Sequence, residues 1–215
     1  MKITPSIPKQ LVPFTGDFLQ RTALCRDGEG DLCGVSVSHL TLTEENLSGM
    51  ALRHAEMTAC RFIGCDLSGA DWTGVRFQRC DFSGSNLSNA SLRRCIFTDC
   101  KAVGLQFIDG AALEIVLENC LLDDSNIVSC AVRKAVVSCC RLRQARLAEC
   151  TLGKLELRQL DCTRATIFHT PLDGLDFTDV ILDGLAANPE TLRGILVTRD
   201  QAADLAPLFG LRVAP

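Results

Sequence analysis

The sequence of 215 residues contains no tyrosine, one tryptophan and three histidines, and no apolar stretch long enough to cross a membrane. The shortage of aromatic side chains argues against an aromatic-lined cofactor pocket. The first 14 residues contain three prolines and no apolar run of the kind found in signal peptides. We therefore expect a cytoplasmic protein that does not contact a membrane.

Positive charge is also scarce, since 22 Lys and Arg stand against 26 Asp and Glu, which gives a net charge of -4 and a pI near 5.4. This balance argues against direct binding of nucleic acid. Short catalytic motifs of the GxSxG, P-loop and HExxH types are missing. Cysteine, in contrast, is abundant: the chain contains 13, and their number needs an explanation.

An apolar residue recurs every five positions through most of the chain. From Leu32 to Leu182 all 31 positions at this spacing are apolar, and no insertion interrupts the frame. Neither the helical period of 3.6 nor the strand period of 2 accounts for it. A chain that turns a corner every five residues instead forms a four-sided coil. Coils stacked like parallel strands would give about 7.75 coils and a rod roughly 37 Å long.

Nine cysteines share one position of this repeat, two residues before the apolar centre, where side chains are small and point inward. They are Cys60, Cys65, Cys80, Cys95, Cys100, Cys120, Cys130, Cys140 and Cys150. Five of them are 20 residues apart and should form one column. In a reducing compartment we interpret these thiols as small hydrophobic side chains rather than disulfides or metal ligands. Cys139 lies outside the pattern and should face solvent.

Catalysis has no support in this arrangement. The three histidines, His39, His54 and His169, fall on different coils and do not share one column. A rod filled with its own side chains is also expected to leave no pocket. We therefore predict a protein that is not an enzyme, with no catalytic residues, no metal site and no cofactor, and whose function lies on its outer surface or at its ends.

The units CDLSG (65–69), ADWTG (70–74), CDFSG (80–84) and SNLSN (85–89) resemble those of pentapeptide-repeat proteins. The resemblance implies an all-β solenoid, namely a right-handed quadrilateral β-helix, here with a short C-terminal helix. We expect an irregular N-terminal cap over residues 1–29, the repeat β-helix over 30–184, and a C-terminal cap and dimerisation segment over 185–215.

The C-terminal segment has the signals of an amphipathic helix, with Thr198 and Gln201 as a capping box and Gly210 at the end. Its sequence, residues 192–213, is similar to the segment by which Qnr-type and MfpA-type proteins dimerise. The alternative is a plug on the open end of the solenoid, and one apolar stripe could serve both purposes. The predicted homodimer interface consists of Leu196, Ala202, Leu205, Ala206, Phe209 and Leu211.

The resemblance to Qnr-type and MfpA-type proteins implies a DNA mimic that binds DNA gyrase and topoisomerase IV and gives protection against quinolones or toxins. The charge on this chain is banded, with -5 over residues 95–132, +5 over 133–169 and -4 over 170–215. The predicted acidic partner-binding surface is formed by Asp173, Asp176, Asp179, Asp183 and Glu190. The basic band departs from an ideal mimic, so an interaction scaffold for an unknown partner remains the alternative.

Overall fold

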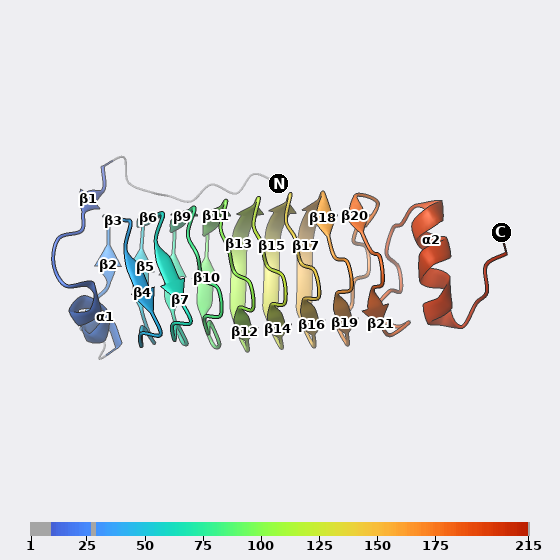
Figure 1. Ribbon diagram of the computed structural model, residues 1–215, viewed down its shortest axis with the longest axis horizontal. Coiled ribbons are helices and arrows are strands. Elements are labelled where there is room, and N and C mark those ends of the chain that lie inside the picture. Colours follow the sequence, from blue (N-terminus) through green and yellow to red (C-terminus); the bar gives the residue numbers. More distant parts are fainter. Residues whose placement is uncertain (1–9, 27–28, 215) are drawn as a thin grey trace.

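The computed structural model describes residues 10–26 and 29–214, and it is a rod of parallel β-coils with a helix near each end (Figure 1). Strand pairing joins residues 20 apart, as Leu52 pairs with Trp72 and Trp72 with Leu92. This register places every fourth repeat unit on the same side of the rod. The predicted four-sided parallel β-helix is therefore the observed fold.

We number the sides by the strands that form them. The first side contains β2 (Leu32–Cys33), β5 (Ala51–Arg53), β8 (Asp71–Thr73) and β10 (Ser91–Arg93). The second contains β3 (Val35–Ser38), β6 (Glu56–Thr58), β9 (Arg76–Gln78) and β11 (Ile96–Thr98). Strands β13 (Ala111–Glu118), β15 (Ala131–Ser138) and β17 (Thr151–Arg158) run across the corner and belong to both sides.

The third side is less regular and pairs β4 (Thr41–Thr43) with β7 (Arg61–Ile63), and β18 (Leu160–Asp161) with β20 (Val180–Ile181). Single bridges continue it between these pairs. The fourth side is a sheet of β12 (Gln106–Ile108), β14 (Asn126–Val128), β16 (Arg146–Ala148), β19 (Thr166–Phe168) and β21 (Ala186–Ala187).

The parallel pairing extends beyond both ends of the five-residue frame. At one end β1 (Val12–Pro13) pairs with β3, and helix α1 (Phe18–Arg26) lies beside the first coils, so the described part of the N-terminal cap is partly helical rather than irregular. At the other end Leu196 forms a bridge with Asp176. Among the described residues, no helix is long and apolar enough to span a membrane.

At nearly every corner of a coil one residue adopts the left-handed backbone region. Glycine occupies some of these positions, but 21 non-glycine residues adopt φ between 49° and 59°. Lys134 and Cys139 are examples, with φ of 55° and 53°. Hydrogen bonds between coils hold the corners, as when the Cys139 amide donates to the Arg158 carbonyl at 3.0 Å. Stacking therefore imposes a conformation that these side chains disfavour by about 1–2 kcal/mol.

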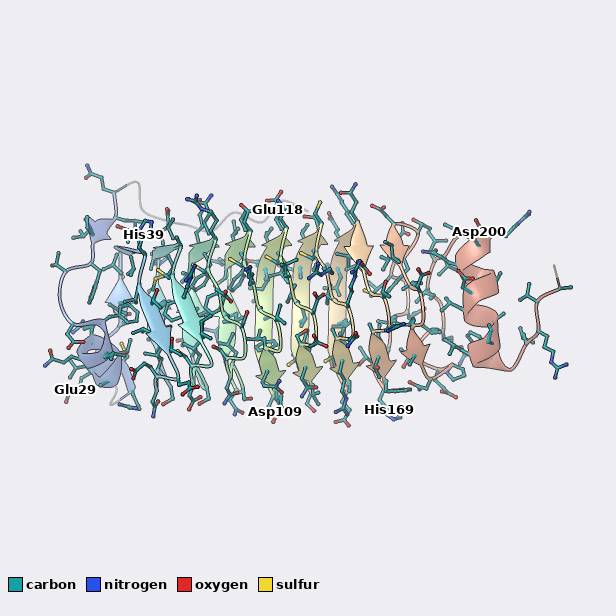
Figure 2. All side chains as sticks on the ribbon, viewed as in Figure 1. Glu29, His39, Asp109, Glu118, His169 and Asp200 are labelled. Carbon is teal, nitrogen blue, oxygen red and sulfur yellow. The ribbon has the colours of Figure 1, made fainter. Side chains whose placement is uncertain are left out.

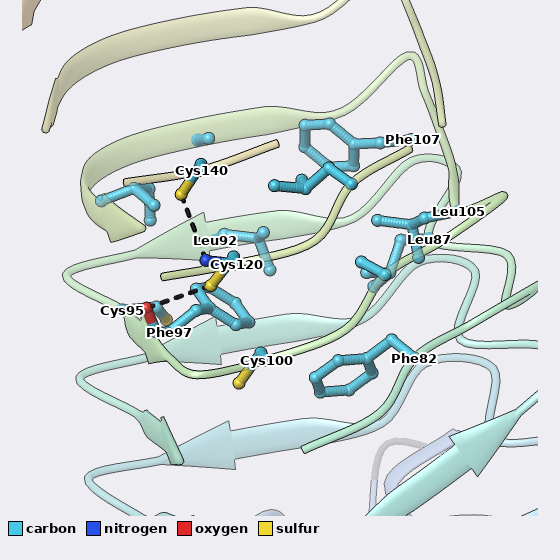
Figure 3. Close-up of a cluster of buried hydrophobic side chains, with 14 of the residues drawn as sticks. Phe82, Leu87, Leu92, Cys95, Phe97, Cys100, Leu105, Phe107, Cys120 and Cys140 are labelled. Atoms are coloured by element: carbon cyan, nitrogen blue, oxygen red, sulfur yellow. Dashed lines mark hydrogen bonds between the residues drawn. The ribbon is translucent and has the colours of Figure 1, made fainter. Parts of the chain in front are cut away.

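The inward thiols form hydrogen bonds that tie one coil to the one before it. Cys80 Sγ donates to the Met57 carbonyl at 3.4 Å and Cys120 Sγ to the Phe97 carbonyl at 3.4 Å, and Figure 3 shows the column from Cys100 to Cys140. All 13 cysteines are free thiols, and only Cys33 and Cys139 are exposed. Burial raises the pKa of Cys95 to about 12, so this inward thiol stays protonated at neutral pH.

The core changes character along the rod. Trp72, Phe77, Phe82 and Phe97 pack against one another, with ring centroids 4.8 Å apart for the tilted pair Trp72–Phe77 and for the stacked pair Phe77–Phe97. After Phe107 the inward centre positions hold aliphatic residues or Cys162 until Phe177, and the small inward positions between them include Ser125 and Thr170. This aliphatic stretch leaves an internal cavity of about 210 Å³. The expectation that the rod leaves no pocket was therefore wrong, because side chains of Val and Ala size do not fill a bore that Phe and Trp fill.

Candidate interaction surfaces

The outward side chains form ladders along each side, because residues 20 apart lie next to one another in successive coils (Figure 2). On the fourth side Asn86 Nδ2 donates to Asp66 Oδ1 at 3.2 Å, and Asn126 Nδ2 donates to Gln106 Oε1 at 3.0 Å. These contacts pair amide and carboxylate groups of successive coils. A charge at one outward position is therefore felt mainly by the coils directly before and after it.

The last full coil carries acidic residues on three of its sides and directly after the fourth. The stretch 165–192 contains five acidic residues and no Lys or Arg. All five acidic side chains are exposed. Asp173 lies on the first side, Asp176 and Asp179 lie on the second, Asp183 lies on the third, and Glu190 follows the fourth. The structure therefore brings the predicted acidic residues together as a band around the rod rather than as a strip along one side.

Three of these carboxylates also accept local hydrogen bonds. Asp176 Oδ1 accepts from the Thr178 hydroxyl at 2.7 Å and from the Thr178 amide at 2.9 Å, and these bonds hold the pKa of Asp176 below its usual value. Asp179 Oδ2 accepts from the Gln159 amide at 2.9 Å. Glu190 accepts from the Asn188 side chain at 3.0 Å, and its pKa is likewise lowered, first by a backbone amide and then by Asn188.

Basic residues lie on all four sides of the rod, and salt bridges partly neutralise them. Arg94 and Lys134 both contact Glu114, each at 3.0 Å, and these contacts lower the pKa of the Glu114 carboxyl. Farther along the rod Arg143 pairs with Asp161 at 2.6 Å. The basic band of residues 133–169 is therefore a partly paired surface, and its exposed pairs contribute little to stability.

The C-terminal cap has a buried part and an exposed part. Helix α2 (Arg199–Leu205) begins at Thr198 with the predicted capping box, and the 3-10 helix η1 (Ala206–Phe209) follows with Gly210 at φ 73°. Gln201 Nε2 donates to the carbonyls of Phe177 at 2.8 Å and Val180 at 2.7 Å, which fastens the helix to the last coil.

The six residues of the predicted dimer interface divide between these two parts. Leu205 and Ala206 are buried against the rod within one chain. Leu196, Phe209 and Leu211 are 57%, 48% and 61% exposed, and Ala202 is exposed as well. Val213, which was not among the predicted interface residues, is 56% exposed as well. The segment thus caps the core and also presents apolar side chains at the end of the rod.

The histidines do not form a site. His39, His54 and His169 each occupy a corner, with φ of 58°, 52° and 49°. Within the described residues, no group of three or more His, Cys, Asp or Glu side chains could hold a metal ion. The outer surface and the C-terminal end therefore remain the candidate sites.

Comparison with known proteins supports the repeat architecture. The family model of pentapeptide repeats matches residues 31–69 and 60–99, with eight copies. A search of curated protein sequences found no match. Among solved structures, full-length QnrB1, a plasmid-mediated fluoroquinolone resistance protein, is 19% identical and has a TM-score of 0.37, over 82% of this chain and 100% of that one.

A second solved structure is HetL, a pentapeptide-repeat protein involved in heterocyst differentiation regulation in the cyanobacterium Nostoc sp. strain PCC 7120. It is 15% identical with a TM-score of 0.42, over 85% of this chain and 98% of that one. Rfr23 from the cyanobacterium Cyanothece 51142 is 16% identical with a TM-score of 0.35, over 71% and 97%. The matched repeats over residues 31–99, together with the same register in the later coils, support a pentapeptide-repeat protein.

Proposed function

We propose that the protein is a non-enzymatic interaction rod that dimerises end to end and presents its acidic coil to the DNA-binding groove of DNA gyrase or topoisomerase IV. The observation that carries this proposal is the stretch 165–192, which has five exposed acidic residues and no Lys or Arg. A groove that binds duplex DNA is strongly positive, and an anionic rod competes for it electrostatically.

Dimerisation would double this acidic band. Leu196, Phe209, Leu211 and Val213 leave an apolar group exposed beyond the last coil, and a second copy of the same end is self-complementary to it in a two-fold interface. The two acidic coils would then lie on either side of the interface. The similarity of residues 192–213 to the dimerising segment of Qnr-type proteins supports this arrangement, and protection against quinolones or toxins would follow from occupation of the groove.

The first side supports a second candidate. Arg93, Arg133 and Lys154 are exposed there. Cations on the contact surface of a DNA mimic would be repelled by the positive groove of its partner. A scaffold that binds an acidic protein through this side would use them. In the first candidate the partner binds the acidic coil, and in the second it binds the basic residues of the first side. Charge-reversal variants therefore distinguish the two.

The test is a DNA supercoiling assay with purified gyrase, with and without ciprofloxacin. We expect inhibition of supercoiling or protection from the drug at micromolar protein. Asp183→Lys should weaken the effect, because the Asp183 carboxylate is exposed on the acidic coil. Glu118→Lys makes the same charge change at an exposed site three coils away and is the matched control. An unaffected gyrase, or equal loss in both variants, would contradict the DNA-mimic proposal and favour the scaffold.

Dimerisation has its own test by light scattering. We expect Phe209→Glu to produce a monomer, because it places a charge within the exposed apolar group. Val12→Glu is the control at the opposite end of the rod, where Val12 is 67% exposed. A monomeric wild-type protein at micromolar concentration would contradict the proposed dimer. Binding of gyrase by the acidic coil would still be tested separately by the supercoiling assay.

A further inference from the structure

The cavity inside the rod has an entirely apolar lining that extends from Phe82 to Phe177. Its volume is about 210 Å³, and its lining consists of Phe, Leu, Ile, Val and Ala side chains and three cysteines. Of the residues that the structure describes, no charged or amide side chain lines it. Water in such a space would find no hydrogen-bond partners, and apolar cavities of this kind remain dry.

Aromatic side chains line the cavity toward both ends of the rod. Phe82, Phe97 and Phe107 line it on the N-terminal side (Figure 3), and Phe177 lines it on the C-terminal side. Between them the lining residues are aliphatic apart from Cys120 and Cys162, and they include Ala112, and Val132 and Val137 of strand β15. The empty volume is therefore built into several successive coils of the sequence.

We propose that this cavity is a binding site for a small apolar molecule without hydrogen-bonding groups, of the size of benzene or xenon. An engineered protein cavity of about 150 Å³ with a similar aliphatic and aromatic lining binds both, and this one is larger. Binding restores the dispersion contacts that the lining side chains lack. It requires no polar recognition, so ligands should be selected by size and apolar character.

Leu160 marks the route into the cavity. It lines the cavity and also an outer hollow of about 430 Å³ between Gln159–Asp161 and Thr178–Ile181. The wall departs from the regular backbone pattern here, because the Gln159 amide donates to the Asp179 carboxylate at 2.9 Å and the Leu160 amide reaches the Asp179 carbonyl only at 3.3 Å. A ligand that displaces the Leu160 side chain would pass from the hollow into the bore.

The experiment compares thermal melting with and without benzene in three proteins. The filled variant, Ala112→Val with Val132→Leu and Val137→Leu, adds four carbons inside the cavity. The control, Ala111→Val with Ala131→Val, adds four carbons at outward neighbours in the same coils. At ten times its dissociation constant benzene should raise Tm by about 3–6 °C in the wild type and the control, and by much less in the filled variant.

Xenon provides a measurement that needs no variant. Xenon should shift the NMR signals of methyl groups that line the cavity, such as Leu142 and Leu147, and not those of Leu67, which is buried outside it. An unchanged wild-type Tm with no xenon shifts, or an equal benzene effect in the filled variant, overturns the site. Leu160→Ala should speed benzene exchange, and an unchanged exchange rate overturns the route.

Discussion

Filling the cavity should stabilise the rod even without a ligand. At about 24 cal/mol per Å³ of cavity, the 210 Å³ void costs roughly 5 kcal/mol relative to a packed bore. The filled variant adds four methyl or methylene groups, each contributing about 0.8 kcal/mol when buried. The expected gain in the free energy of unfolding is therefore about 3 kcal/mol. This gain is smaller than the roughly 5 kcal/mol that the void costs, so the variant fills only part of the cavity.

Urea unfolding followed by far-UV circular dichroism measures this gain. With a slope of about 1.5–3 kcal/mol per M, the midpoint should rise by roughly 1–2 M. Fluorescence of Trp72, the only tryptophan, reports on the aromatic half of the core. Hydrogen exchange in β13, β15 and β17 shows whether the added protection is located in the coils around the cavity.

The control is an inward residue where the core is already full. Val75 is 0% exposed, does not line the cavity, and belongs to the coil that holds Trp72 and Phe77. Val75→Leu adds one carbon there and should destabilise the protein by about 1–3 kcal/mol through overpacking. If the filled variant also loses stability, the bore has no usable space and the reasoning from cavity volume is refuted.

Three further predictions concern the surface. A thiol reagent should label Cys33 and Cys139 in the folded protein and spare the other 11 cysteines, as mass spectrometry of the labelled peptides would show. Ala59→Gly should stabilise the protein by about 0.5–1 kcal/mol, because Ala59 has φ 53° and glycine adopts this conformation without strain. Ala51 lies outside the left-handed region, so Ala51→Gly should destabilise the protein by a similar amount in the same urea denaturation assay. The lowered pKa of Asp176 means that its stabilisation is complete above the ordinary Asp value, near 4, and is lost as pH falls through the lower folded value; an NMR titration giving an ordinary pKa would contradict this.

The sequence predicts the interior of this protein better than its corners. The five-residue period determines which side chains point inward, and the coil geometry follows because each inward ring must stack on the next. The corners could not be predicted in the same way, because Lys134 or Cys139 in a left-handed conformation contradicts local preference. The hydrogen bonds from the adjacent coils outweigh that preference, and they exist only after stacking.

The cavity was missed for a related reason. Every fifth position from Ala112 to Ile167 is apolar, as the repeat requires. A pattern of apolar and polar residues carries no information on the volume of the side chains. The signal in the sequence was the absence of aromatic residues at inward positions between Phe107 and Phe177. The acidic coil was found by counting charge, but the division of the C-terminal cap into buried Leu205 and exposed Phe209 depends on how helix α2 meets the last coil.

The strand alternation makes the two proposed sites independent, although they overlap along the chain. Leu175 and Phe177 line the cavity, while Asp176 between them is exposed on the acidic coil. A charge change at Asp176 should therefore alter partner binding without changing benzene binding. A change of inward volume at Ala112 lies three coils away and should do the reverse. If benzene binding and gyrase inhibition responded together to both substitutions, the rod would be coupled along its length rather than acting as a stack of nearest-neighbour coils.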